Sequence, residues 1–381
     1  MKRILNILRE IRQKKSHYTP IIEVVISKSA LLHNLKEFQK TYPAMQFAPV
    51  LKSNAYGHGL VTVAKILEHE TIAFFAVDSL YEANVLRASH VHAPILIMDY
   101  TPVQNIVNAR HMNIAFAITS LMQLQELVKA KHATTIHLKV DTGMHRQGFL
   151  PEEIDTMIKI IKENSQIHIE GIFSHFANAH RADKQSETHA QIACWETMVA
   201  QIKSQIMGIK YFHLANTAGT HFMKDATCNV GRVGIGMLGH NPSPFTQMNL
   251  QPALRLETII GGVKKIHQGD CVGYNNSFCA PGEMTIATIP LRYFEGIDRR
   301  LSNKGVVQVR GIDCPIIGDV SMNITSIDVS QIDGIQLNEK VIVISDRATD
   351  KNSEENIAAQ IGEIPYVILS RIPGHLHRRV G

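Results

Sequence analysis

The sequence predicts an α/β protein, a closed parallel (β/α)8 barrel of the TIM type followed by a mainly β C-terminal domain. Between residues 47 and 238, short apolar runs alternate with helical stretches, which is typical of such a barrel. After about residue 245, Gly and Pro separate β-rich runs at short intervals, and regular helices become rare. The chain of 381 residues is also longer than a domain with a single compact core usually is, which predicts more than one domain.

The predicted barrel strands are eight apolar runs. They lie at 47–52, 72–78, 95–99, 114–119, 136–140, 169–174, 211–215 and 230–238. A first helix is expected at 30–39, and the clearest later ones at 60–70, 80–88, 121–131, 152–163 and 189–206. An open doubly wound sheet would alternate in the same way. However, no GxGxxG motif follows the first strand, so nothing supports a dinucleotide site.

We expect three segments: an N-terminal extension at 1–20, the barrel at 21–250 and the β domain at 251–381. In the extension, apolar residues share one helical face and Lys and Arg the other. Packing on the protein itself or on a partner subunit is the main interpretation, and a membrane-surface helix is the alternative. A late helix is expected at 354–361. No secretory signal pattern or spanning apolar stretch occurs, which favours a cytoplasmic location.

Composition excludes several classes of protein. With 45% hydrophobic and 19% charged residues, the chain is expected to be globular and soluble. The net charge of +5 comes without a basic stripe interleaved with aromatics, so no nucleic-acid partner is expected. The five cysteines are scattered and lack CxxC spacing, which predicts ordinary core or surface residues rather than disulfides or a metal site. They are Cys194, Cys228, Cys271, Cys279 and Cys314.

In a barrel of this kind, chemistry takes place at the C-terminal ends of the strands. Cationic, hydroxyl and glycine residues follow five of the predicted strands. They include Lys52 and Tyr56, Lys139 and Arg146, His175, Asn216 and Thr217, and Arg232 with Gly234. Their convergence at one face predicts a pocket for an anionic ligand such as a phosphate.

Lys52 is the pivotal residue because it ends an otherwise apolar strand, FAPVLK. A desolvated lysine has a lowered pKa and reacts readily with carbonyl groups. Taken alone, Lys52 is better explained as a strand-end lysine that reaches solvent, and the motif around it reverses that interpretation.

The segments around these residues resemble bacterial alanine racemases. LKSNAYGHG at 51–59 resembles the cofactor-binding motif of that family, and further motifs follow in family order over about residues 21–370. They are LKVDTGMHRQGF, GIFSHFANA, HLANTAG, VGRVGIGMLG, VGYNNSF, TIATIPLRYFEGIDRRLSN and PIIGDVSMNITSIDV. The resemblance implies a barrel followed by a β domain, which is also what the periodicity predicts.

The resemblance implies pyridoxal 5'-phosphate as cofactor, bound covalently to Lys52. The cofactor phosphate is expected to be held by Tyr56, Thr217 and the backbone at Gly234 and Ile235. His175 and Asn216 complete the implied cofactor site, and Arg232 is expected to face the pyridine nitrogen. Because an arginine stays charged, it cannot protonate that nitrogen, which restrains side reactions.

For catalysis, the resemblance implies an acid and a base on opposite faces of the α-carbon. Lys52 serves one face, and Tyr274 from a second subunit serves the other, helped by His175 and Arg232. Arg146 and Met322 are expected to bind the substrate carboxylate region, and Tyr293 to line the entrance. Lys139 corresponds to a lysine that is often carbamylated in this family. The resemblance implies that Lys139 orients Arg146.

The implied activity interconverts L-alanine and D-alanine in a homodimer with shared sites, supplying D-alanine for peptidoglycan. The alternatives are a racemase for serine or a broad set of substrates, a non-catalytic pyridoxal-phosphate-binding protein, and a barrel-type amino-acid decarboxylase. The residues that follow the barrel, with Tyr274 and Met322 among them, favour the racemase. The chain departs from the family pattern at His145, Phe278 and Asn323, and in its C-terminal tail.

Overall fold

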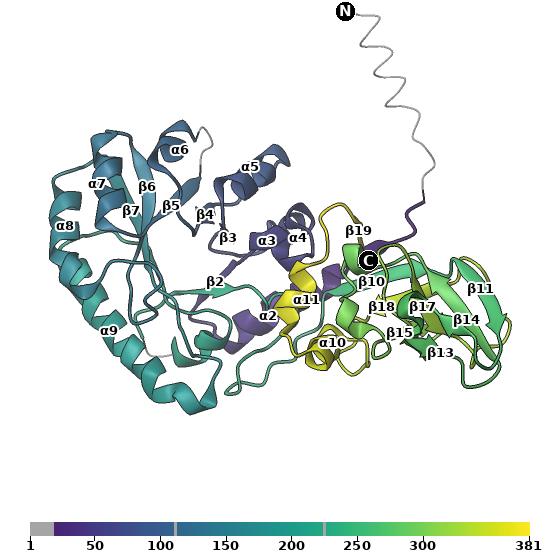
Figure 1. The fold of residues 1–381 in the computed structure, drawn as a ribbon. Coiled ribbons are helices and arrows are strands. Elements are labelled where there is room, and N and C mark those ends of the chain that lie inside the picture. The colour runs from purple at the N-terminus through teal and green to yellow at the C-terminus, as the bar shows by residue number, and fades with distance from the viewer. Residues whose placement is uncertain (1–18, 110–112, 224–225) are drawn as a thin grey trace, which may run out of the picture. The chain divides into compact units, whose positions relative to one another are not determined.

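The computed structural model describes residues 19–109, 113–223 and 226–381, so nearly all of the predicted N-terminal extension lies outside the described residues. The chain forms two compact units (Figure 1). The barrel unit comprises residues 26–255, 345–374 and 380–381. The β unit comprises residues 256–344 and 375–379, with the described residues up to Val25. No helix among the described residues is long and apolar enough to cross a membrane.

The barrel unit contains eight parallel strands. Six lie in the order β3-β4-β5-β6-β7-β8, and β2 pairs with β9. A β-bridge between Val50 and Ala76 joins the β2 side to β3, and a hydrogen bond from the Asn229 N–H to the Phe212 carbonyl joins the β9 side to β8. These two links close the sheets into a ring. The predicted (β/α)8 fold is therefore confirmed. The strands are β2 (Gln46–Pro49), β3 (Phe75–Val77), β4 (Ile95–Ile97), β5 (Ile114–Ile118), β6 (Thr134–Lys139), β7 (Ile167–Phe173), β8 (Tyr211–His213) and β9 (Val230–Val233).

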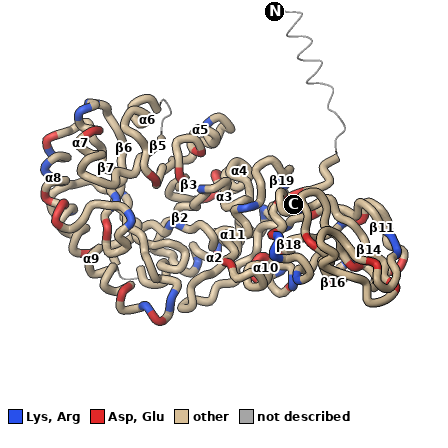
Figure 2. Tube along the Cα trace, in the orientation of Figure 1, with Lys and Arg blue, Asp and Glu red and all other residues tan. Residues whose placement is uncertain are grey.

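Helices follow the strands around the barrel. They are α2 (Lys28–Thr41), α3 (Lys52–Tyr56), α4 (Leu60–Leu67), α5 (Leu80–Ala88), α6 (Val103–Asn108), α7 (Leu121–Lys129), α8 (Ile154–Lys162) and α9 (Gln185–Lys203). Ser27, Ser79 and Ser120 cap three of them by accepting a backbone N–H. In α8 the buried residues recur with helical spacing, and charges of both signs lie along α7, α8 and α9 (Figure 2).

The β unit contributes most of a sheet with the order β11-β14-β17-β16-β15-β18-β10-β1-β19. Its strands are β1 (Glu23–Ile26), β10 (Leu254–Ile259), β11 (Gly262–Ile266), β14 (Met284–Ile289), β15 (Val306–Val309), β16 (Ile312–Ile317), β17 (Thr325–Asp328), β18 (Lys340–Ile344) and β19 (His377–Val380). The helices α10 (Glu354–Ile361) and α11 (Pro365–Ser370) belong to the barrel unit. Six residues are too few to show a helical period, so α11 was not predicted.

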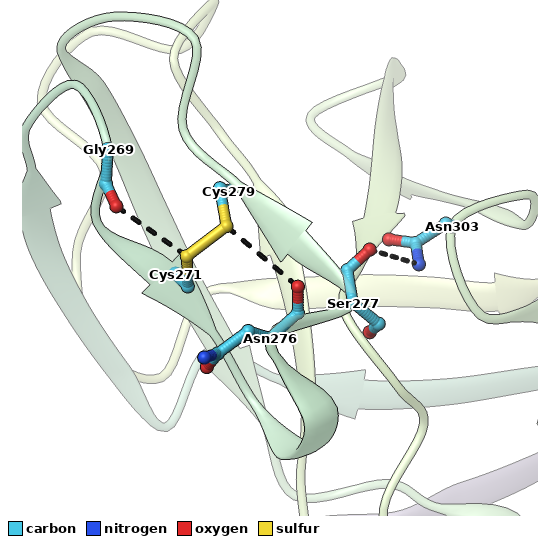
Figure 3. Close-up of a disulfide and its surroundings, with 6 residues drawn as sticks. All are labelled: Gly269, Cys271, Asn276, Ser277, Cys279 and Asn303. Carbon is cyan, nitrogen blue, oxygen red and sulfur yellow. Dashed lines mark hydrogen bonds between the residues drawn. A yellow bond between two sulfur atoms is a disulfide. The ribbon is translucent and has the colours of Figure 1, made fainter.

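The expectation that no cysteines pair is wrong for Cys271 and Cys279, which form a disulfide (Figure 3). The short strands β12 (Cys271–Val272) and β13 (Phe278–Cys279) pair antiparallel and place the two cysteines directly opposite each other, with Cα atoms 4.0 Å apart. Neither strand is long enough to show an alternating pattern in the sequence. The remaining cysteines are free: Cys194, Cys228 and Cys314.

Candidate active site

A left-handed turn follows Lys52. Ser53, Asn54, Ala55 and Tyr56 all have φ between 50° and 56°. This conformation costs roughly 1–2 kcal/mol per non-glycine residue, so surrounding contacts must hold it. The Asn54 side chain does so by accepting the Leu60 N–H at 2.9 Å. Lys52 itself leaves the strand with its Nζ 3.9 Å from Asp78 Oδ1.

Gly57 closes this turn with a φ of +83°. A Cβ on Gly57 would lie 2.0 Å from the Leu369 carbonyl oxygen, which is backbone of α11 and cannot move aside easily. The turn that carries Lys52 is thus packed against α11. Tyr366 of the same helix contacts the Tyr56 ring edge-on, with centroids 6.0 Å apart. Sequence reasoning missed Tyr366, because nothing in the tail predicts this contact.

Arg232 is buried in the barrel and is held by groups from β7 and β8. Its Nη1 donates to the His213 carbonyl and lies 2.9 Å from His213 Nδ1, and its Nη2 donates to the Ser174 carbonyl at 2.7 Å. Nη2 also lies 3.2 Å from His175 Nδ1. Burial lowers the pKa of Arg232 to about 10, so the guanidinium stays charged near neutral pH.

Burial lowers the pKa of His175 well below its ordinary value, and the positive charge of Arg232 lowers it further. His175 is therefore neutral near neutral pH. A neutral imidazole whose Nδ1 accepts from Arg232 carries its proton on Nε2. The two predicted helper residues are thus in contact with each other within the barrel unit.

A chain of histidines continues from Arg232 through the barrel core. His213 Nε2 lies 2.7 Å from His137 Nδ1, and His137 Nε2 lies 3.5 Å from a Glu170 carboxylate oxygen. Burial lowers the pKa of both histidines, so both are neutral near neutral pH. Sequence analysis gave them no role. The available signal was that His137 precedes Lys139 by two residues and so shares its face of β6.

The carboxylate of Glu170 at one end and the guanidinium of Arg232 at the other set the same order of protons along this chain. The carboxylate only accepts, so His137 carries its proton on Nε2 and accepts on Nδ1 from His213 Nε2. His213 Nδ1 is then left as an acceptor for Arg232. The side chain of Glu170 is partly exposed, so the chain reaches from the surface to the buried guanidinium.

We expect Glu170→Leu to leave each histidine in its single tautomer, because Arg232 still donates to His213 Nδ1, but to remove the acceptor that faces His137 Nε2. The free energy of unfolding should fall by about 1 kcal/mol, since water replaces part of the lost bond. Denaturant unfolding measures this loss, and nitrogen-15 spectra of His137 and His213 report the tautomers. Glu170→Gln is the control, because its amide oxygen still accepts. A mixture of tautomers in the leucine variant would contradict the role of Arg232 in the proton order.

Lys139 ends β6 with its Nζ 2.7 Å from Gln147 Oε1. Burial, and then the charges of Arg146 and Arg232, lower the pKa of Lys139 to about 7. Arg146 is exposed, in a turn that Asp141 holds through three backbone N–H groups at 2.9–3.1 Å. His145, which stands where the family usually has glycine, adopts a φ of 53° in that turn.

The turn after β9 and the residues around it form a cradle of donors. A Cβ on Gly234 would lie 2.5 Å from Tyr56 Oη, and Thr217 Oγ1 accepts the Gly236 N–H at 3.4 Å. Within the described residues, the buried N–H groups of Gly234 and Ile235 donate to no protein acceptor. Hydroxyls and free N–H groups around a space closed to side chains suit a phosphate.

Asn216 lies in the loop after β8. Its Oδ1 accepts the Gly219 N–H at 2.8 Å, and it thereby holds the short 3₁₀ helix at Ala218–Met223. This contact gives Asn216 a role in shaping the loop after β8, next to Thr217.

The remaining predicted residues lie on the β unit. The side chains of Tyr274, Met322 and Tyr293 are exposed by 71%, 59% and 42%. The Asn275 side chain donates to Asp319 at 3.0 Å, which ties the loop of Tyr274 to the segment that leads to Met322. The structure thus groups the barrel residues in one unit and leaves these three exposed on the other.

The chain thus combines a (β/α)8 barrel that carries a lysine and a buried arginine with a β unit. Models of the alanine racemase N-terminal domain and C-terminal domain match residues 26–242 and 253–380. The chain belongs to the alanine racemase family and is an isomerase.

Individual proteins agree with this assignment. Alanine racemase 2 of Caldanaerobacter subterraneus is 31% identical over 365 residues, which cover 93% of each chain. The structure of alanine racemase from Bacillus anthracis with bound L-Ala-P has a TM-score of 0.88, with 29% identity and 96% of each chain covered. The alanine racemase from Bartonella henselae with covalently bound pyridoxal phosphate, 24% identical, shares the fold with a TM-score of 0.83 over 95% of this chain and 100% of that one.

Proposed function

We propose that this protein interconverts L-alanine and D-alanine with pyridoxal 5'-phosphate as cofactor, by a two-base mechanism that uses Lys52 and Tyr274. The observation that carries the proposal is the convergence of Lys52, the phosphate-type cradle and Arg232 in one barrel unit. The reaction would supply D-alanine for peptidoglycan in the cytoplasm.

The residues present fit the cofactor. Lys52 would hold it covalently, and the hydroxyls of Tyr56 and Thr217 with the N–H groups of Gly234 and Ile235 would hold its phosphate. Arg232 would face its ring nitrogen. The buried N–H groups of the cradle are the observation that tests this fit, because a phosphate supplies the acceptors that they lack. When bound, pyridoxal phosphate withdraws electrons from the α-carbon and so acidifies the α-hydrogen.

Two residues would move the proton. Lys52 Nζ and Tyr274 Oη serve opposite faces of the α-carbon, so that one removes the proton while the other supplies one. A free tyrosine titrates near 10 and needs help to act as a base. The charge of Arg232 and the Nε2–H of the neutral His175 would stabilise the phenolate.

Tyr274 would come from a partner subunit. Among the described residues of the β unit, eight large apolar side chains are exposed, and five of them lie in the segments 274–294 and 322–324. These five are Tyr274, Tyr293, Phe294, Met322 and Ile324. A two-fold dimer would cover such a surface and build two equivalent shared sites. In each site, Tyr293 would line the entrance.

Arg146 and Met322 would bind the substrate carboxylate region, and Lys139 would orient Arg146. With its pKa lowered to about 7, Lys139 carries a neutral fraction near neutral pH that adds carbon dioxide and loses a proton. The resulting carbamate is anionic. It would replace the repulsion between Lys139 and Arg146 by an attraction.

The test is incubation of the pyridoxal-phosphate-loaded protein with single L-amino acids, followed by chiral chromatography. We expect L-alanine, and likewise D-alanine, to approach equal amounts of both enantiomers. Faster conversion of serine would instead indicate an altered substrate. A protein that binds the cofactor but converts no amino acid would be the non-catalytic alternative.

A further inference from the structure

The Cys271–Cys279 disulfide closes the base of the loop that carries Tyr274 (Figure 3). We propose that this disulfide is a positioning device for Tyr274, which a dithiol reductant can open. The inference rests on the proposed role of Tyr274 and deepens it. Neither cysteine touches the substrate in this account, and both act through the loop.

The loop has a buried base and an exposed tip. At the base, Val272 is buried and Phe278 packs beside it against a small apolar cluster that contains Ile266, Ala280, Ile286 and Ile317. At the tip, residues 274–277 are all exposed. Burial therefore fixes where the loop starts and ends but does not fix the tyrosine.

The backbone of the tip needs a constraint. Gly273, Asn275 and Asn276 have φ values of 74°, 60° and 48°, all in the left-handed region. For a non-glycine residue that region is sparsely populated and persists where the surroundings enforce it. Two consecutive asparagines in this conformation directly follow Tyr274, so a change in their backbone would redirect its side chain.

Few non-covalent contacts enforce the tip. The side chains of Asn275 and Ser277 both form hydrogen bonds with Asp319, and the Ser277 carbonyl accepts from the Asn303 side chain at 3.2 Å. These bonds are at the surface, where water competes for them. The strands β12 and β13 contribute only two residue pairs. The disulfide is thus the strongest constraint on the loop among these contacts.

The disulfide is also accessible. Cys271 and Cys279 are both exposed, whereas the free cysteines Cys194, Cys228 and Cys314 are half-buried or buried. Dithiothreitol in its thiolate form can attack either exposed sulfur. Two electrons and two protons pass to the cysteines, the S–S bond breaks into two thiols, and the reductant becomes a cyclic disulfide. An external disulfide such as oxidised glutathione reverses the change, because it accepts the two electrons and two protons and becomes two thiols.

The test compares the dimeric holoenzyme before and after dithiothreitol with a Cys271→Ser/Cys279→Ser variant. Mass spectrometry after alkylation should find these two cysteines protected before reduction and labelled after it. Reduction, or the double substitution, should lower racemisation by roughly 10-fold, because a misplaced acid–base group loses part of its effect. Cys194→Ser is the matched control, and it should keep the native rate and the response to dithiothreitol.

Exchange of the substrate α-hydrogen with heavy water separates positioning from general damage. Loss of loop order should slow exchange for the one enantiomer that Tyr274 deprotonates and spare the other, whereas a structural defect slows both. Labelled cysteines before reduction, or native rates in both the reduced protein and the double variant, would overturn the inference. A Tyr274→Phe variant that racemises normally would instead refute the proposed function.

Discussion

Replacing Lys52 with alanine should abolish covalent attachment of pyridoxal phosphate and reduce racemisation below detection. The variant loses both the amine that holds the cofactor and the acid–base group of one face, and the second loss alone costs on the order of 10²–10⁴-fold. Lys52 is only half-buried and alanine is smaller, so the fold should survive. The measurement is borohydride reduction of the loaded protein, followed by identification of the labelled peptide.

Lys139 is the rival for this assignment. Its pKa of about 7 makes Lys139 a readily deprotonated amine, and it lies at the end of another barrel strand, β6. Lys139→Ala is therefore the matched control, and it should keep the label on Lys52. A label on Lys139 in the native protein would refute the role of Lys52.

Replacing Tyr274 with phenylalanine should lower racemisation by on the order of 10²–10⁴-fold in both directions, because each direction uses both acid–base groups. The ring remains and the hydroxyl is at the surface, so the free energy of unfolding should hardly change. Racemisation rates from both enantiomers and a thermal unfolding curve measure these outcomes.

Mixed subunits provide the control for sharing. If Tyr274 comes from the partner, a heterodimer of a Lys52→Ala chain and a Tyr274→Phe chain has one intact site. Mixing the two inactive proteins under conditions that exchange subunits should restore part of the activity. Heterodimers without activity would argue that each chain builds its own site.

The barrel was predictable because its strands are short, apolar and separated by amphipathic helices. The last strand shows where the pattern misleads. The apolar run at 230–238 predicts one long strand, yet β9 ends at Val233 and the chain turns at Gly234. That turn places the N–H groups of the cradle, and residue types alone do not reveal it.

Other parts of the site depend on contacts between distant segments. His137 and His213 are 76 residues apart in the sequence. They meet only because both side chains, one on β6 and one on β8, point into the barrel interior. The packing of Gly57 against Leu369 likewise joins the start and the end of the barrel unit. The cysteine pair was missed for a related reason, since its two strands have only two residues each.

The exchange of the α-hydrogen with heavy water in Tyr274→Phe tests the two-base account most directly. Each alanine enantiomer is incubated with the loaded variant, and deuterium at the α-carbon is followed by mass spectrometry or NMR. We expect exchange to persist for the enantiomer whose α-hydrogen faces Lys52, which removes and returns the proton on its own side, and nearly to vanish for the other. Equal loss for both enantiomers, with the cofactor still bound, or native racemisation, would contradict the assignment of Lys52 and Tyr274 to opposite faces.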